Sequence, residues 1–371
     1  MVGPVSAGII EQYREFWRHQ NNNALLYIKH QASENLAHEK GLVKPWMTMP
    51  SEWWGFAEAV NLAYNSGDFT YVRELLDLIA YEIKQIGYAG VGYPMFKANL
   101  GAGSLAAMIT GFSRLGDNTV WFELDEPWPY DRIISVDSFS PYADTIRLAM
   151  QLATEYLGGL AVISQNDLGG LADVLSSLRR NDGFLYDLYD NPNEVKQALD
   201  TLKKLWFRAY EETDALLKPV NGGLHTHWIN LLSEEPYYPH QCDACALFGP
   251  EHFRELILPS LADEMVRFPA TAYHLDGSAQ ICHLDALCES PTLKVIQWVP
   301  EPNTLQNDEQ YYPLYRQIIE NGRKIAFTDW RSDAADLRRF FKVFPCEAFF
   351  ISLWANDTSE CTEYLQIAEG K

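Results

Sequence analysis

The sequence has no cluster of lysine or arginine residues, and its charge is strongly of one sign. Acidic residues number 50 against 29 basic ones, which gives a formal net charge of −21 at pH 7. Nucleic acids and anionic membrane surfaces attract basic proteins, so we expect neither as a partner. The acidic balance favours solubility and does not by itself indicate a substrate.

Long apolar runs and a disulfide framework are also missing. No window reaches the roughly 18 uncharged apolar residues that a membrane-spanning helix needs. Residues 1–10 contain no basic region before an apolar stretch, so we expect no export signal. The six cysteines are dispersed along 371 residues, which is not the spacing of a disulfide scaffold. These absences predict a cytoplasmic protein with reduced thiols.

Three catalytic signatures are absent as well: the serine nucleophile elbow, the phosphate-binding lysine loop and the dinucleotide fingerprint. What the sequence contains instead is an alternation of short apolar runs and helical segments. We expect eight runs to be strands, at residues 94–99, 119–124, 160–167, 223–230, 271–277, 294–299, 324–329 and 348–354. Strands that alternate with helices are typical of a parallel sheet, and eight such units predict an α/β fold of the (β/α)₈ barrel type.

The chain length fits a single domain over residues 1–371, in which residues 91–371 form the barrel and residues 1–90 form a mainly helical cap. That cap includes a candidate strand at residues 25–30. Asn191-Pro192 followed by Glu194 predicts a helix through about Lys218. Pro250-Glu251 predicts another helix, which runs to about residue 268.

His274 and Asp276 are the first candidates for chemistry. They lie two residues apart at the end of an apolar run, so in a strand both side chains face the same side. Gly277 then releases the chain into a loop at the end of the barrel where active sites are built. The pair predicts a metal site or a general acid and base. The alternative is a histidine of the barrel interior bonded to a neighbouring backbone group.

A second group surrounds Tyr238, where His240, Cys242 and Asp243 are close together. Imidazole and thiolate groups are ligands for zinc, and His274 or Asp276 would complete the set. His225 and His227 form a further candidate pair for metal binding. Most predicted strands also end in a polar or aromatic residue that could line the site or cap a helix: Asn99, Asp167, His227, Asp276, Trp298, Asp329 and Trp354.

Aromatic residues make up 13% of the chain and favour a pocket for a flat or apolar ligand, to which Trp53 and Trp54 in the N-terminal portion would contribute. Together with Asn99, Asp167, Tyr238 and Trp298 they form the predicted substrate-binding set.

Four blocks of the sequence carry a resemblance to a known family. They are Leu-Tyr-Asp-Leu-Tyr-Asp-Asn-Pro at 185–192, Tyr-Pro-His-Gln-Cys-Asp at 238–243, Tyr-His-Leu-Asp-Gly at 273–277 and Gln-Trp-Val-Pro at 297–300. In their order and spacing these blocks resemble the uroporphyrinogen decarboxylase-like superfamily, which includes cobalamin-linked methyltransferases. The resemblance extends from about residue 94 to the C-terminus and implies a (β/α)₈ barrel.

The two branches of that superfamily imply different chemistry. Its decarboxylases hold the porphyrinogen carboxylates with an N-terminal arginine-rich segment, whereas here only Arg14 and Arg18 flank Phe16-Trp17. Its methyltransferases hold zinc with a strand-end His-x-Cys and a later cysteine. His274 matches that histidine, Asp276 stands at the first cysteine, and no cysteine follows near Trp354.

The resulting hypothesis is a corrinoid-linked or related methyltransferase that acts on a small organic substrate. His274, Asp276 and Asp243 would be catalytic, and His274, Asp276, Cys242 and His240 would bind zinc. A partner protein would carry the corrinoid. The alternatives are a decarboxylase for another carboxylate, and a barrel that binds a corrinoid or tetrapyrrole without catalysis.

Overall fold

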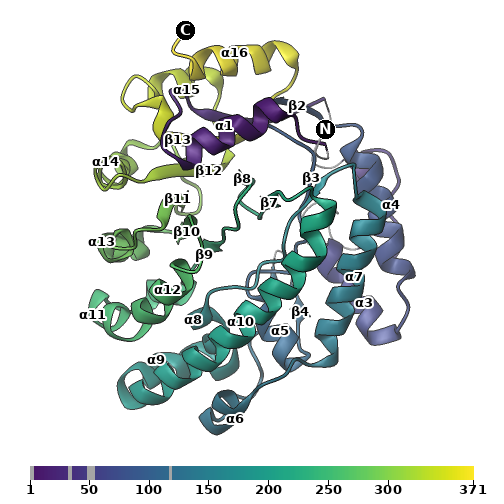
Figure 1. The fold of residues 1–371 in the computed structure, drawn as a ribbon, viewed down its shortest axis with the longest axis vertical. Helices are drawn as coiled ribbons and strands as arrows, with labels where there is room; N and C mark the ends of the chain where they lie inside the picture. Colours follow the sequence, from purple (N-terminus) through teal and green to yellow (C-terminus); the bar gives the residue numbers. More distant parts are fainter. Residues whose placement is uncertain (1–3, 32–35, 48–54, 117–118) are drawn as a thin grey trace.

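The centre of the molecule is a seven-stranded sheet (Figure 1), in a computed structural model that describes residues 4–31, 36–47, 55–116 and 119–371. In the order in which they pair, its strands are β2 (Gly87–Gly90), β1 (Leu25–His30), β13 (Phe349–Trp354), β12 (Lys324–Trp330), β11 (Leu293–Val299), β10 (Thr271–Asp276) and β9 (Pro239–His240). All neighbours run parallel except β1 and β2. The α/β class is therefore confirmed, with a mostly parallel sheet.

Both faces of this sheet are buried, as is usual for parallel strands. One face, which we call the inner face, packs into a small core that includes Leu25, Tyr27, Ala272, Val295, Ala326 and Phe350. Helix α1 (Ala7–Trp17) closes this core with Tyr13 and Phe16. The opposite, outer face adds Leu26, Ile28, Tyr273, Leu275, Ile296 and Ile351 to the large core beneath the helices.

Helices cover the outer face and the rest of the molecule (Figure 1). The longer ones are α3 (Gly55–Ser66), α4 (Thr70–Ile83), α7 (Pro141–Leu157), α8 (Leu171–Arg179), α9 (Asn181–Asp190), α10 (Pro192–Val220), α12 (Leu258–Met265), α14 (Tyr312–Glu320) and α16 (Thr358–Ala368). The shorter ones are α2 (Leu36–Glu39), α5 (Ser104–Thr110), α6 (Tyr130–Ser135), α11 (Pro250–His252), α13 (Leu284–Cys288) and α15 (Ala334–Phe340). None of the helices in the described ranges combines the length and apolar character needed to cross a bilayer.

The remaining strands are short and pair in twos. β3 (Met95–Phe96) and β6 (Val162–Ile163) run parallel. β4 (Arg114–Leu115) and β5 (Val120–Trp121) form an antiparallel hairpin, and so do β7 (His225–Thr226) and β8 (Leu232–Ser233).

Two strand predictions need correction. Residues 119–124 do not form a parallel strand, because β5 turns back onto β4 through a bond from Gly116 N–H to the Thr119 carbonyl. The run at 223–230 yields only β7, since Asn230 has a φ of 64° and the chain reverses toward β8. In the described residues no strand pairing joins these short strands to the large sheet, so a closed ring of eight strands is not shown.

The N-terminal portion is more than a helical cap. β1 lies inside the sheet, where its residues pair with β13 in register from Leu25↔Phe350 to Lys29↔Trp354. The helix predicted from residue 192 is confirmed as α10. The one predicted from Pro250 is interrupted, because the π-helix η2 (Phe253–Ile257) separates α11 from α12.

Candidate functional site

Polar side chains replace apolar ones on the inner face as the parallel strands approach their carboxyl ends. Side chains two residues apart share a face. In each long parallel strand, the residue two positions after an inner-core residue lies on the same face. These residues are Lys29, His274, Gln297, Thr328 and Ser352. Because the carboxyl ends of parallel strands meet at one edge, these groups lie where α/β enzymes place their active sites.

Asp243, His274 and Asp276 come together at this edge. Each offers one ligand atom, and these three atoms lie within 4.8 Å of one another. His274 and Asp276 belong to β10, whereas Asp243 begins the 3₁₀ helix η1 (Asp243–Leu247) after β9. The Nε2 atom of His274 is 3.8 Å from Oδ1 of Asp243. That Oδ1 atom is buried and has no hydrogen-bond partner among the described residues.

The ring of His274 is held in one orientation. Its Nδ1–H donates to Oε1 of Gln297, and Nε2 of Gln297 donates to the hydroxyl of Thr328 at 3.3 Å. The amide oxygen of Gln297 can only accept, so this contact places the hydrogen of a neutral His274 on Nδ1 and leaves its lone pair on Nε2. The indole of Trp228 packs edge-on against the same ring, with centroids 4.9 Å apart.

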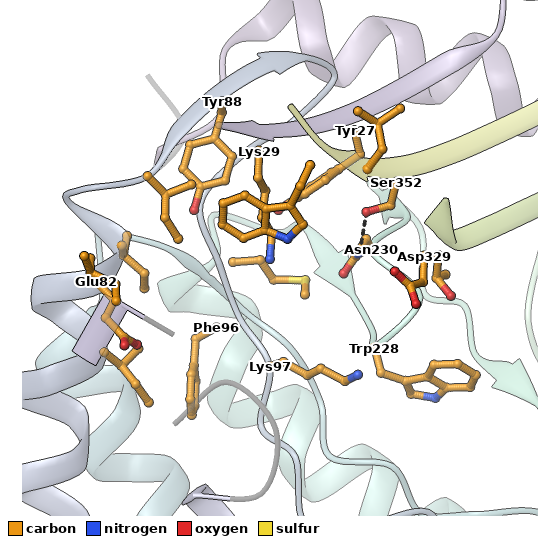
Figure 2. A pocket seen from close by; sticks show the side chains of 18 of the residues that line it. Tyr27, Lys29, Glu82, Tyr88, Phe96, Lys97, Trp228, Asn230, Asp329 and Ser352 are labelled. Atoms are coloured by element: carbon orange, nitrogen blue, oxygen red, sulfur yellow. Dashed lines mark hydrogen bonds between the residues drawn. The ribbon is translucent and has the colours of Figure 1, made fainter. Parts of the chain in front are cut away.

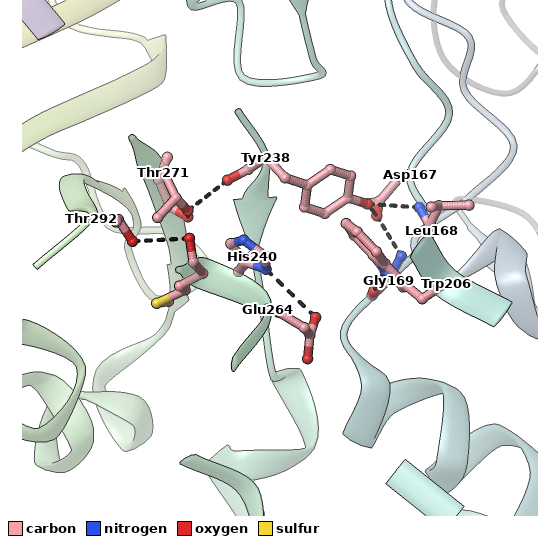
Figure 3. Close-up of polar contacts among 11 residues, drawn as sticks. Asp167, Leu168, Gly169, Trp206, Tyr238, His240, Glu264, Thr271 and Thr292 are labelled. Atoms are coloured by element: carbon pink, nitrogen blue, oxygen red, sulfur yellow. Dashed lines mark hydrogen bonds and ion pairs between the residues drawn. The ribbon is translucent and has the colours of Figure 1, made fainter. Parts of the chain in front are cut away.

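Asp167 is a third carboxyl group at this edge. Its Oδ1 accepts hydrogen bonds from Gly169 N–H at 2.8 Å and from the hydroxyl of Tyr238 at 3.2 Å (Figure 3). Burial raises the pKa of Asp167 to about 6, and the N–H of Gly169 partly opposes this shift. Burial also raises the pKa of Asp276. Both groups are therefore easier to protonate than ordinary carboxyls.

Two neighbouring cavities open at the same edge. The small chamber holds about 160 Å³ and is lined by residues that include Lys97, Asn99, Asp167, Trp228, Asp243 and His274. The large chamber holds about 290 Å³, and its polar lining includes Lys29, Asn230, Gln297 and Asp329 (Figure 2). Lys97 and Trp228 line both chambers, so the two chambers adjoin at these side chains.

Three of the predicted site residues face away from these chambers. Trp298 is buried on the outer face against Tyr311, because it neighbours Gln297 and so points in the opposite direction. His240 pairs with Tyr273 in the β9–β10 register and therefore shares its outer face. There its Nδ1 lies 3.6 Å from Oε2 of Glu264 (Figure 3).

The structure likewise places Cys242 away from His274. It is buried and lines a separate, very small cavity beside Glu264 in α12. A hydrogen bond with Cys245, together with burial, raises the pKa of the Cys242 thiol. A metal ligand must be a thiolate, so this environment opposes the predicted role. Of the four predicted metal ligands, the structure brings His274 and Asp276 together beside Asp243, and it places His240 and Cys242 elsewhere.

The other predicted residues divide between the site and its surroundings. Asn99 and Asp167 line the small chamber, whereas Tyr238 lines neither chamber and instead holds Asp167. His225 Nδ1 pairs with Asp214 at 3.0 Å. Trp53 and Trp54 lie outside the described residues.

Sequence reasoning did not identify Gln297, Lys97 or Lys29 as site residues. Each is a polar residue within an apolar strand-like run, which is a usable signal because strands buried on both faces seldom carry long polar side chains without a partner or ligand. Lys97 also lies two residues before Asn99, a position that places both on one face of an extended chain.

Comparisons with known proteins give no assignment, since no family model matches this chain and no curated protein matches it in sequence. The superfamily resemblance stays a prediction.

Proposed function

We propose that the protein is a metal-dependent enzyme for a small organic substrate, and that its reaction is methyl transfer to or from a corrinoid carried by a partner protein. One observation carries the metal-dependent part: Asp243, His274 and Asp276 converge beside a cavity at the carboxyl ends of the strands. The sequence resemblance to cobalamin-linked methyltransferases supports the choice of methyl transfer.

The donor set fits a divalent metal such as zinc. Carboxylate oxygens and a neutral imidazole are ordinary zinc ligands. Gln297 leaves the lone pair of His274 on Nε2, which is the atom nearest Asp243. A metal ion would also supply a partner for the buried Oδ1 of Asp243, which has none among the described residues. When bound, the ion would act as a Lewis acid and lower the pKa of a coordinated hydroxyl or thiol.

The residues of the chain have separate tasks in this reaction. Asp243, His274 and Asp276 bind the ion, and Gln297 orients the imidazole. Trp228 forms an apolar wall beside the reacting groups and keeps water out. The bond that breaks joins the methyl carbon to a substrate oxygen or sulfur atom, and its electron pair remains on that atom. The methyl carbon would form its new bond with the electron pair of the reduced cobalt in the corrinoid of the partner protein. Asp167 supplies a proton to the oxygen or sulfur atom from the small chamber.

The same proposal extends to the fold and the location. We infer that β3, β6 and β7 complete a (β/α)₈ barrel with the large sheet, because β3 and β6 run parallel and the backbone N–H of Gln165, just after β6, bonds to the Thr226 carbonyl of β7. The six free cysteines suit a reducing cytoplasm.

The direct test is methyl transfer by the zinc-loaded protein with free cobalamin in its reduced state. Methylated oxygen, sulfur and nitrogen compounds are offered in turn, and methylcobalamin is followed by visible absorbance. Wild-type protein should form it with at least one compound, whereas His274→Ala should not. A matched control, Cys242→Ser, changes a buried side chain outside the site and should retain the rate. Failure of the whole series would reject methyl transfer and leave a carboxy-lyase or a binding role.

A carboxy-lyase is the second candidate, and the position of Asp167 favours it. In that reaction the bond to a substrate carboxyl group breaks, carbon dioxide leaves, and the electron pair remaining on carbon takes the proton of Asp167. Release of carbon dioxide without cobalamin, and its loss in Asp167→Asn, would identify this activity. Turnover by either methyl transfer or decarboxylation would reject a purely binding role.

A further inference from the structure

We propose that the large chamber binds a planar aromatic compound that carries a hydrogen-bond donor, and that the Oδ1 atom of Asn230 accepts the bond from this donor. This substrate class deepens the proposed function and rests on it, because the large chamber adjoins the small one that contains His274.

Asn230 has a backbone conformation that few residues with a side chain adopt. Its φ of 64° lies in the left-handed region, where glycine meets no steric cost and asparagine is tolerated. The residue is held there by its N–H, which donates to the His227 carbonyl at 3.0 Å. Its own carbonyl accepts from the hydroxyls of Tyr93 at 3.2 Å and Tyr13 at 3.3 Å. Glycine would form the same turn with less strain, so an asparagine at this position indicates a task for its side chain.

The amide of Asn230 is fixed in one direction. Its Nδ2 donates to the hydroxyl of Ser352 in β13 at 3.1 Å (Figure 2). Its Oδ1 lies on the other side of the planar amide, where it points into the open space of the chamber and has no hydrogen-bond partner among the described residues (Figure 2). A carbonyl oxygen only accepts, so an acceptor held in place before binding favours a ligand with an O–H or N–H group.

The walls of the large chamber favour a flat ring as the body of that ligand. Aromatic side chains from four separate parts of the chain line it: Tyr27, Tyr88, Phe96, Trp228 and Trp354. Figure 2 shows Tyr88, Phe96 and Trp228 around one open space. A planar ring gains edge-on or offset contacts with such side chains, which a saturated ring of the same size does not.

The volume of the chamber fits one substituted ring. It holds about 290 Å³, whereas an engineered apolar cavity of about 150 Å³ already accepts benzene. The additional space admits substituents on the ring, and one of them can be the donor that reaches Asn230.

The test is calorimetric titration of protein treated with a chelator, so that binding does not depend on a metal. The probes are 4-methoxyphenol, 1,4-dimethoxybenzene, which lacks the donor, and 4-methoxycyclohexanol, which lacks the planar ring. We expect 4-methoxyphenol to bind about tenfold more tightly than 1,4-dimethoxybenzene, because the diether leaves the oxygen of Asn230 without a donor. It should bind about fivefold more tightly than 4-methoxycyclohexanol.

Substitutions of Asn230 separate its side chain from its backbone conformation. Asn230→Gly keeps the conformation but removes the acceptor, so it should bind the phenol and the diether equally. Asn230→Asp keeps an acceptor at the same place and should retain the preference for the phenol. Asn303→Gly is the matched control, because Asn303 also has a left-handed φ, of 67°, and is exposed away from both chambers. It should retain the preference of the wild type.

Equal affinity of the wild type for the phenol and the diether, or an unchanged preference in Asn230→Gly, would overturn the role of Asn230. Equal affinity for the phenol and the cyclohexanol, or no binding of any probe, would overturn the aromatic substrate class. Failure of the proposed function gives a different result, because selective binding of the phenol by a protein that takes up no metal would reject only the metal chemistry. Metal binding without this selectivity would reject only the substrate class.

Discussion

At the residue scale, the candidate site depends on which face each strand residue occupies. His274 and Gln297 face the chambers, whereas their neighbours Tyr273 and Trp298 face the helices. The sequence identified His274 and Asp276 because both are polar and two residues apart. It assigned Trp298 wrongly, because strands buried on both faces are apolar throughout and their composition does not reveal the inward direction.

Replacement of Gln297 tests the orientation of His274. Gln297→Leu removes the acceptor for Nδ1–H, so the ring can adopt the other tautomer, and affinity for zinc should fall by about 10–100-fold. Gln297→Glu keeps an acceptor at the same place and should retain most of the affinity. Competition with a chromogenic chelator measures both constants, with the exposed Gln310→Leu as control. Unchanged affinity in Gln297→Leu would show that the imidazole is not oriented by this contact.

His227 predicts a pH dependence of stability. It is buried between Tyr237 and Tyr238, with ring centroids at 4.7 and 5.0 Å, and burial lowers its pKa from 6.5 to about 3. Between these two pH values the unfolded chain binds a proton that the folded protein does not, so the free energy of unfolding falls as pH falls.

His227→Phe removes this titration and keeps a ring of similar shape. Between pH 6.5 and 4.5 the variant should lose about 2 kcal/mol less stability than the wild type. Urea unfolding at the two pH values measures the difference in the free energy of unfolding. The contributions of the other titrating groups cancel, because both proteins contain them. Equal losses in the two proteins would mean that His227 is protonated in the fold.

At the element scale, prediction succeeded where strands are long. The runs at 271–277, 294–299, 324–329 and 348–354 correspond to β10–β13, since six or seven mainly apolar residues between turns favour a buried strand. The short strands in the first part of the chain were harder to predict. β3, β6 and β7 have two residues each, so their positions depend on tertiary contacts that local patterning does not encode. Thr119–Leu124 could equally supply a hairpin arm, because alternation does not distinguish parallel from antiparallel strands.

An ion pair between α8 and α9 should contribute strongly to stability. Nε of Arg179 lies 2.7 Å from Oδ2 of Asp187, and the two side chains are 17% and 4% exposed. Arg179→Met leaves the buried carboxylate without its charged partner, although Asn191 still donates to it, and should cost about 3–5 kcal/mol in urea unfolding. The double variant with Asp187→Leu should recover part of this loss. Arg208→Met, which breaks the exposed pair with Glu212, should cost at most about 1 kcal/mol. Equal costs for the two arginines would contradict the buried role of Arg179.

At the scale of the whole molecule, the two ends of the chain are joined in one sheet. β1 from the N-terminal portion lies between β2 and β13, and α1 closes the inner core. The single domain over residues 1–371 stays a prediction, and the pairing of β1 with β13 is the reason to expect that the two portions unfold together.

Thermal unfolding should therefore show one cooperative transition. Differential scanning calorimetry should give a single peak whose calorimetric enthalpy equals the van't Hoff enthalpy. Added salt should raise the midpoint, because it screens the self-repulsion of a chain with a net charge of −21. Two separate peaks would show that residues 1–90 and 91–371 fold as independent units.

The most direct test of the central claim is the metal content and affinity of the purified protein. We expect one zinc or similar divalent ion per chain by mass spectrometry after metal loading and desalting. His274→Ala and Asp243→Asn should lose it, whereas Cys242→Ser should retain it, because the Cys242 side chain lies outside the Asp243, His274 and Asp276 cluster. Absence of stoichiometric metal in the wild type, or equal metal in His274→Ala, would contradict a metal centre at this site.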